Sequence, residues 1–362
     1  MRPIFFVGIA LALLFSLLAP AFLVSAQVQA ADPQTYQVLV GAENVSRGVG
    51  VMAYFPETLT IHVNDTVLWK QNTHEIHTVT FLAGTTAPLL LVPVPATPPP
   101  PPPVQPGELE INPLAAFPDP QTGSAYNGST YANSGVMSTD PGSPTQYSLI
   151  FTTPGTFTYQ CLVHGAMMSG TIVVEPPSVN IPSPAAVSKQ AQVTMKMKLA
   201  KATTLFGKAM AQVPPPQINQ DGTTNYTVLV GWAKGQLELM QFFPGKLVVH
   251  PGDTVTFMLS EANDAPHTVT FLNGAADINF VLPVPNPPGP PILLLNPQVV
   301  DAINPDQPLT RTGIFSSGIL FPGLPIPASY MLQIGDINGN ISYQCLLHDT
   351  SGMDGLLKVV PR

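Results

Sequence analysis

The sequence contains one series of short phrases twice, in the same order, and this duplication constrains the fold more than any other feature. The closing phrase of the first copy is YQCLVHGAMMSG at residues 159–170, and that of the second is YQCLLHDTSGMDG at residues 343–355. The other main matches are YQVLVG (36–41) with YTVLVG (226–231), YFP (54–56) with FFP (242–244), HVNDTV (62–67) with HPGDTV (250–255), and HTVTFL (77–82) with HTVTFL (267–272). We therefore expect two similar domains, at residues 32–178 and 221–362, joined by a linker at residues 179–220.

Each copy has the composition of a β-structure. The matching phrases are short, rich in Val, Thr, Ile, Tyr and Phe, and separated by Gly, Pro, Asn and Asp. Apolar and polar side chains alternate in TLTIHV at residues 58–63, which is typical of a strand with one buried face. Several such strands per copy predict an all-β fold with one β-sandwich in each copy. Two proline-rich segments, which include residues 98–103 and 287–291, are expected to be surface loops, because proline has no N–H group to donate within a sheet.

The charge of the chain changes sharply at the linker. Residues 32–175 contain ten acidic and two basic side chains, and residues 221–362 contain eleven and five. Residues 176–220 contain five lysines and no acidic residue. Residues 185–212 are mostly good helix formers, so we expect a basic, partly helical linker with an interruption near Gly207. The two acidic domains argue against nucleic-acid binding, because phosphate groups are recognised by clustered Lys and Arg.

The N-terminus has the pattern of a secretory signal peptide. Arg2 precedes an almost unbroken apolar run at residues 4–18, and small residues near Ala26 offer a cleavage site. We expect residues 1–26 to be removed, or cleavage as late as residue 31. An uncleaved membrane anchor is the alternative, although the run is short for a span of about 20 residues. The mature protein is then expected to be secreted, periplasmic or at the cell surface, without a transmembrane span.

The two cysteines of the chain occupy equivalent positions in the two copies. Two cysteines in an exported protein usually form a disulfide, but this one would have to join equivalent sites of two separate domains. Each cysteine instead has other candidate ligands nearby. The two sets are His77, Cys161 and His164 with Met167 or Met168, and His267, Cys345, His348 and Met353. A thiolate, two imidazoles and a thioether form the ligand set of a blue-copper centre, whereas a structural zinc site usually lacks methionine.

Both copies resemble the cupredoxins, and the second copy is particularly similar to the plastocyanin-like domains with blue (type 1) copper. The resemblance lies in the phrases DTVTF (253–257), APHTVTF (265–271) and Tyr-Gln-Cys-x2-His-x4-Met-x-Gly (343–355). It implies two Greek-key sandwiches, each with copper at one end. It also implies that electrons enter or leave through the exposed loop histidines, which are His164 and His348 by position.

The axial ligand of the first copy has two candidates. Its loop is one residue shorter than that of the second copy. Counting forward from Cys161 with the amicyanin-like spacing selects Met167. Counting back from Gly170 selects Met168, which we favour because this glycine begins the closing strand.

These ligand sets favour an exported electron carrier with two type 1 copper ions, one per domain, that shuttles single electrons between redox proteins such as cytochromes. Because the domains are acidic, partners are expected to dock through a basic face. The alternatives are a two-domain multicopper oxidase or nitrite-reductase-like enzyme, and a periplasmic copper buffer. Such enzymes typically carry a histidine directly before the ligand cysteine, where this chain has Gln160 and Gln344. The histidines outside the two sets, at positions 62, 74 and 250, form no His-x-His pair, so we expect no enzymatic activity.

Overall fold

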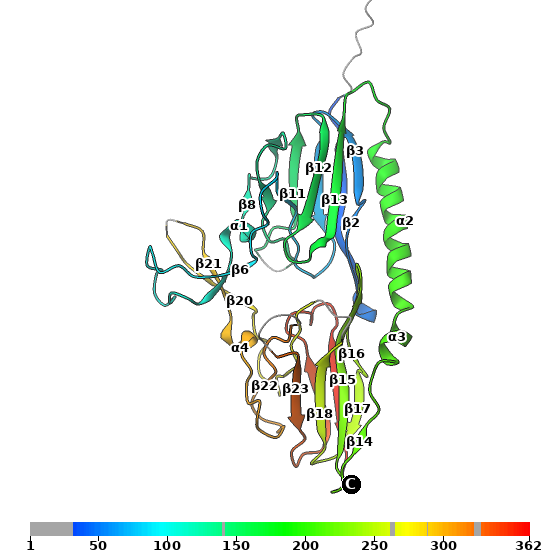
Figure 1. Ribbon diagram of the computed structural model, residues 1–362, viewed down its shortest axis with the longest axis vertical. Coiled ribbons are helices and arrows are strands. Elements are labelled where there is room, and N and C mark those ends of the chain that lie inside the picture. Colours follow the sequence, from blue (N-terminus) through cyan, green and yellow to red (C-terminus); the bar gives the residue numbers. More distant parts are fainter. Residues whose placement is uncertain (1–31, 140–141, 261–264, 288, 322–326) are drawn as a thin grey trace, which may run out of the picture. The chain divides into compact units, whose positions relative to one another are not determined.

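The structure is a computed structural model that describes residues 32–139, 142–260, 265–287, 289–321 and 327–362 (Figure 1). The predicted signal peptide at residues 1–26, with its later cleavage site, lies outside the described residues. Within the described ranges, no helix is both long enough and apolar enough to cross a membrane.

In the first half of the chain, two sheets pack face to face around an apolar core. One sheet runs in the order β2 (Val49–Phe55), β1 (Thr35–Asn44), β4 (Thr66–Gln71), β11 (Gln146–Phe151) and β9 (Ser124–Tyr126). The other runs in the order β3 (Thr58–His62), β13 (Gly165–Glu175), β12 (Gly155–Cys161), β5 (Thr80–Phe81), β10 (Ala132–Ser134) and β8 (Pro118–Asp119). The short helices η1 (Val45–Arg47) and α1 (Pro113–Ala116) lie in the connections. The buried ring of Trp69 on β4 contacts Phe81 and Tyr159 of the opposite sheet, which fixes the two sheets against each other.

The second half repeats this arrangement. One group of strands runs in the order β16 (Leu237–Phe243), β15 (Thr224–Lys234), β18 (Thr254–Leu259) and β23 (Ser329–Gln333), with β14 (Gln217–Ile218) paired to β15. The facing sheet runs in the order β17 (Lys246–Val249), β25 (Asp354–Val359), β24 (Gly339–Gln344), β19 (Thr270–Phe271) and β22 (Phe315–Ser316), and α4 (Pro297–Val300) lies in a connection. Parallel pairing recurs in both halves, between β1 and β4 and between β15 and β18. The sequence duplication is therefore a structural repeat, and the predicted β fold is confirmed.

A strand pair joins the two halves. β2 pairs antiparallel with β16, so that one sheet continues from the first half into the second. β2 is buried along its whole length. Its sequence, VGVMAYF, is apolar throughout, as expected for a strand that is covered on both faces. Residues from Asp32 to Arg362 consequently form one compact unit, and the domain boundaries at 178 and 221 stay predictions.

The linker packs against this junction. Its main helix, α2 (Pro184–Thr203), lies along β1 and β2 (Figure 1). The buried Ala191 and Ala202 of α2 belong to an apolar cluster that includes residues of both halves. Lys198 contacts Glu57 of the first half, and its Nζ donates a hydrogen bond to Oε1 of Gln236 of the second half at 2.5 Å. The linker thus contributes to the core between the halves.

The linker helix is interrupted three residues earlier than the sequence predicts. α2 ends at Thr203, and Gly207 lies inside the next helix, α3 (Phe206–Met210). The hydroxyl groups of Thr203 and Thr204 donate hydrogen bonds of 2.7 Å to the carbonyl oxygens of Ala200 and Lys201. Because such bonds compete with the helical backbone pattern, the two threonines account for the break.

The proline-rich segments are loops flanked by strands. The first lies between β6 (Leu91–Pro93) and β7 (Leu109–Ile111), and the second lies between β20 (Val281–Val284) and β21 (Ile292–Leu295). β7 pairs with β21, where Leu294 lies opposite Glu110. The four strands therefore form a small sheet shared by the two halves (Figure 1).

Candidate metal centres

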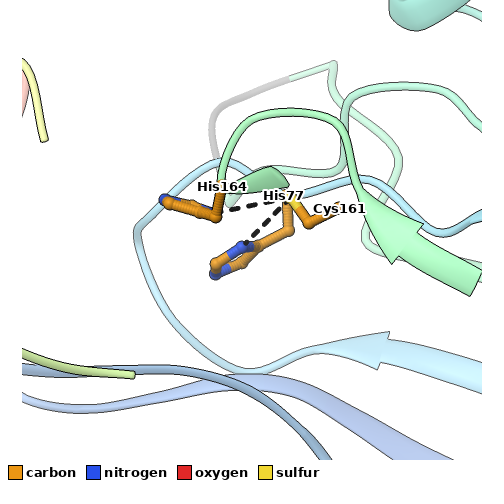
Figure 2. A group of neighbouring side chains, drawn as sticks. All are labelled: His77, Cys161 and His164. Atoms are coloured by element: carbon orange, nitrogen blue, oxygen red, sulfur yellow. Dashed lines mark hydrogen bonds between the residues drawn. The ribbon is translucent and has the colours of Figure 1, made fainter. Parts of the chain in front are cut away.

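Three of the residues predicted as ligands meet in the first half (Figure 2). The main chain of His77 pairs with that of Met137 through hydrogen bonds of 3.1 and 2.7 Å, which fixes the position of the imidazole ring. Cys161 ends β12, and His164 lies in the turn that leads to β13. The Sγ atom of Cys161 lies 3.5 Å from Nδ1 of His164 and 3.9 Å from Nδ1 of His77. His77 and Cys161 are fully buried, and His164 is partly buried.

The second half builds the same centre. The main chain of His267 pairs with that of Leu320 through hydrogen bonds of 3.0 and 2.7 Å. The Sγ atom of Cys345 lies 3.4 Å from Nδ1 of His348 and 3.8 Å from Nδ1 of His267, and the two Nδ1 atoms are 3.0 Å apart. All three side chains are buried. Each half therefore brings together one sulfur and two Nδ1 atoms.

These separations suit a metal ion at the centre of each trio. An ion about 2.3 Å from a thiolate sulfur and about 2.0–2.1 Å from an imidazole nitrogen, with an angle of about 120° between them, places the two ligand atoms about 3.8 Å apart. The measured sulfur–nitrogen distances are 3.4–3.9 Å. A soft thiolate with two imidazoles excludes Ca²⁺ and Mg²⁺, which prefer oxygen ligands. The side chains therefore fit a transition-metal ion such as copper or zinc.

Backbone donors point at both sulfur atoms. The N–H group of Thr78 lies 3.4 Å from the Cys161 sulfur, and the N–H group of Thr268 lies 3.3 Å from the Cys345 sulfur. The hydroxyl groups of the same two threonines accept hydrogen bonds of 2.8 Å from the residues that follow each cysteine, Leu162 and Leu346. Each threonine thus holds its cysteine strand in place and offers a hydrogen bond that stabilises a thiolate.

A glycine lies against the upstream imidazole of each centre. Gly41 on β1 has φ +70° and Gly231 on β15 has φ +65°, a backbone conformation that residues with a side chain rarely adopt. A Cβ atom at Gly41 would lie 2.7 Å from Nε2 of His77, and one at Gly231 would lie 2.2 Å from Nε2 of His267. The phrase that ends in these glycines is repeated in the sequence, but the sequence alone does not indicate that they make room for the imidazoles.

The three candidate axial methionines differ in burial. Met168 on β13 is fully buried in the same apolar cluster as Cys161. Met167 is partly exposed, and its carbonyl oxygen accepts a hydrogen bond of 3.2 Å from Nε2 of Gln236. Met353 is fully buried in the cluster that contains Cys345. In the first half, burial therefore favours Met168 over Met167.

The side chains of the first centre perturb one another's pKa values. Burial alone would raise the pKa of Cys161, but His164 and His77 outweigh it and hold this pKa well below its usual range. Burial alone would lower the pKa of His164, but the Cys161 sulfur outweighs it and raises this pKa to about 9. The pKa of His77 is lowered, chiefly by burial. The centre thus favours the thiolate, the form of cysteine that binds metal ions.

One residue of the first half reaches the second centre. Oε1 of Glu75 lies 3.2 Å from Nε2 of His348, and both side chains are buried. Burial alone would lower the pKa of His348, but Glu75 and the Cys345 sulfur outweigh it and raise this pKa well above its usual value. The expectation that His348 is exposed is therefore wrong, because Glu75 covers its outward nitrogen. The sequence holds one signal for this contact: the second copy has Ala265 where the first has Glu75.

The histidines outside the two trios contact other groups. His62 Nε2 lies 2.8 Å from the carbonyl oxygen of Val179, and His250 Nδ1 lies 2.8 Å from that of Val360. His74 Nδ1 lies 2.5 Å from Oε1 of Glu43. Each of these three rings is thus anchored outside the two centres.

The first half of the chain matches a family of copper binding proteins. Residues 41–175, which contain every proposed ligand of the first centre, match the plastocyanin/azurin family of copper binding proteins. No curated protein matches the chain. Similar solved structures include an oxidized amicyanin variant (23% identity) and another amicyanin variant in its Cu(I) form (22% identity), which each match 39% of this chain and 82% of their own. They also include a fern plastocyanin variant (21% identity), which matches 37% of this chain and 99% of its own. The TM-score is 0.22 in all three cases. The first half of the chain is therefore similar to this copper-binding family, and the second half repeats its fold and its trio of side chains.

Proposed function

We propose that this protein is an exported electron carrier that binds two type 1 copper ions, one in each half. The proposed ligands are His77, Cys161 and His164 in the first half, and His267, Cys345 and His348 in the second. The observation that carries the proposal is that a sulfur and two Nδ1 atoms converge in both halves at separations suited to a metal ion. Bound copper would supply a one-electron couple between Cu(I) and Cu(II).

The protein's own contribution is a rigid, dry site. Backbone pairing at His77 and His267 and the adjacent glycines hold the two upstream imidazoles in one orientation. The threonine N–H groups stabilise the sulfur in its anionic form. A site whose ligands are locked by their surroundings reorganises little when its charge changes by one electron, which suits electron transfer.

We assign the axial positions to Met168 and Met353. Both are buried in the apolar cluster that contains the ligand cysteine of their half. Met167 remains the alternative in the first half, where it is partly exposed. In this proposal, residues 32–178 and 221–362 each form a copper domain, and residues 179–220 link them.

In this proposal, the protein is an electron carrier and not an enzyme. A multicopper oxidase or a nitrite reductase needs further histidines for a catalytic copper site. Each of the three histidines outside the trios contacts a backbone carbonyl or Glu43 instead, at 2.5–2.8 Å. A pure copper buffer is disfavoured because buffers use open, exposed ligands. Four of the six proposed histidine and cysteine ligands are instead fully buried.

Partners are proposed to be redox proteins such as cytochromes, which would dock through a basic face onto this acidic protein. His164 is the proposed electron port to partners, because it is the ligand histidine with partial exposure. His348, the second predicted port, is covered by Glu75.

The test is to express the protein with copper, count the metal per chain and record the visible spectrum. We expect two copper ions per chain, an intense thiolate-to-copper absorption band, and negligible turnover with oxygen or nitrite. A colourless protein, or one in which zinc fills both sites, contradicts the proposal. Steady turnover of nitrite or oxygen would favour the enzyme instead.

A further inference from the structure

Glu75 of the first half and His348 of the second form a buried ion pair, in which Oε1 of Glu75 lies 3.2 Å from Nε2 of His348. Glu75 has 7% and His348 has 4% of its surface exposed. Two ionisable groups are rarely buried without a compensating interaction. The pair therefore fixes the outward nitrogen of His348, while its Nδ1 faces the Cys345 sulfur at 3.4 Å.

Glu75 is itself held firmly. Its N–H group donates a hydrogen bond of 2.9 Å to Oγ1 of Thr73, and the side-chain amide of Gln71 donates to its carbonyl oxygen. A single residue, Ile76, separates Glu75 from His77, a proposed ligand of the first centre. One short stretch of backbone thus carries both a ligand of the first centre and the carboxylate that contacts a ligand of the second.

We propose that Glu75 links the two centres into one internal relay, in which an electron passes between them through His77, the backbone of residues 75–77 and the ion pair with His348. This inference rests on the proposed function. In the step, one electron leaves Cu(I) in one half and reduces Cu(II) in the other, with no bond broken and no net proton transferred. A single-electron donor from outside supplies the first electron.

The position that carries Glu75 differs between the two copies. The residue of the second copy that corresponds to Glu75 is Ala265, which has no carboxylate to offer to His164. Glu75 is thus a positioning residue that belongs to one half and acts on the centre of the other.

The experiment uses the full chain loaded with copper and compares Glu75→Gln with the wild type. A radiolytic pulse injects less than one electron per chain, and the redistribution of the electron between the two thiolate-to-copper bands is followed in time. A rate that does not depend on protein concentration identifies transfer within one chain. Cys345→Ser, which lacks the second thiolate, should abolish this phase.

Glu43→Gln is the matched control. Glu43 lies at the same junction, where it contacts His74 at 2.5 Å and Oγ of Ser351 at 3.3 Å. Its substitution removes the same negative charge without touching the ion pair to His348. We expect Glu75→Gln to slow the internal transfer by about 10–100-fold, the loss of activity that typically follows removal of an outer partner of a metal-bound histidine. It should also shift the reduction potential of the second centre alone. Glu43→Gln should change the rate of internal transfer by no more than about twofold and should leave the reduction potential of the second centre unshifted.

Equal transfer rates in Glu75→Gln, Glu43→Gln and the wild type would overturn the relay while leaving the electron-carrier proposal intact. Should Glu75→Gln fail to fold, Glu75→Asp serves instead. It keeps the charge but withdraws the carboxylate from His348, and an unchanged rate in this variant would equally overturn the relay. A wild type without two thiolate-to-copper bands would refute the proposed function itself.

Discussion

The glycines that face His77 and His267, which are Gly41 and Gly231, give the sharpest test of the site geometry. In Gly231→Ala, the new Cβ would lie 2.2 Å from Nε2 of His267, and the residue would keep φ +65°. A left-handed backbone costs a residue with a side chain about 1–2 kcal/mol. Overpacking of a buried site costs about 1–3 kcal/mol more. We therefore expect the free energy of unfolding of the metal-free protein to fall by about 2–5 kcal/mol.

The displaced imidazole should also weaken metal binding. Because a shift of a supporting group typically costs 10–100-fold in metal affinity, we expect the second centre of Gly231→Ala to bind copper about 10–100-fold more weakly. The first centre should keep its affinity. Denaturant unfolding of the metal-free protein measures the stability, and competitive copper titration measures each affinity.

Gly274→Ala separates the clash from the backbone strain. Gly274 has φ +86° in the same half, and nothing lies within 4 Å of the position that its Cβ would take. This variant should lose about 1–2 kcal/mol of stability and no copper affinity. If Gly231→Ala matches Gly274→Ala in both measurements, the imidazole of His267 does not depend on the space beside Gly231, and the reasoning is refuted.

Three further predictions concern the ligands and the core. Cys345→Ser should halve the copper content and remove one thiolate-to-copper band while leaving the other, and the loss of both bands would show that the centres are not independent. Met168→Leu should shift the spectrum and the reduction potential of the first centre, whereas Met167→Leu should leave them within error; the opposite result would assign the axial position to Met167. Burial raises the pKa of Tyr126 to about 12, so its contribution to stability is complete below pH 10 and declines from there to pH 12, as the unfolded chain loses the phenolic proton first. Denaturant unfolding at pH 9 and pH 11, compared with Tyr126→Phe, checks the direction.

The sequence predicted which three side chains meet in each half, and there is a physical reason for this. Cys161 and His164 are three residues apart, and His77 begins a phrase rich in β-branched residues that must enter the core. Once each copy forms a sandwich, the strand end that carries His77 and the turn that carries His164 have few places to lie. The repetition of the whole pattern in the second half makes the prediction stronger.

The contacts between the halves could not be predicted in the same way. The pairing of β2 with β16 depends on which strand edges remain free after each half has folded, and the sequence does not state this register. The uniformly apolar VGVMAYF was the available signal that β2 has no exposed face. The linker was predicted to be basic and partly helical from its lysines and helix formers, but the sequence does not show that Ala191 and Ala202 contact both halves. Glu75 was not recognised, since its partner lies 273 positions away at residue 348.

The pairing of β2 with β16 is also reciprocal. In the duplication, Val49, Gly50 and Val51 correspond to Leu237, Glu238 and Leu239, and the structure pairs Val49 with Leu239, Gly50 with Glu238, and Val51 with Leu237. This is how two identical subunits meet across a two-fold axis. In a dimer of identical subunits every substitution at such an axis appears twice, so neither side can specialise. Covalent fusion lifts that restriction, because each copy can then change by itself: the first carries Glu75 where the second carries Ala265.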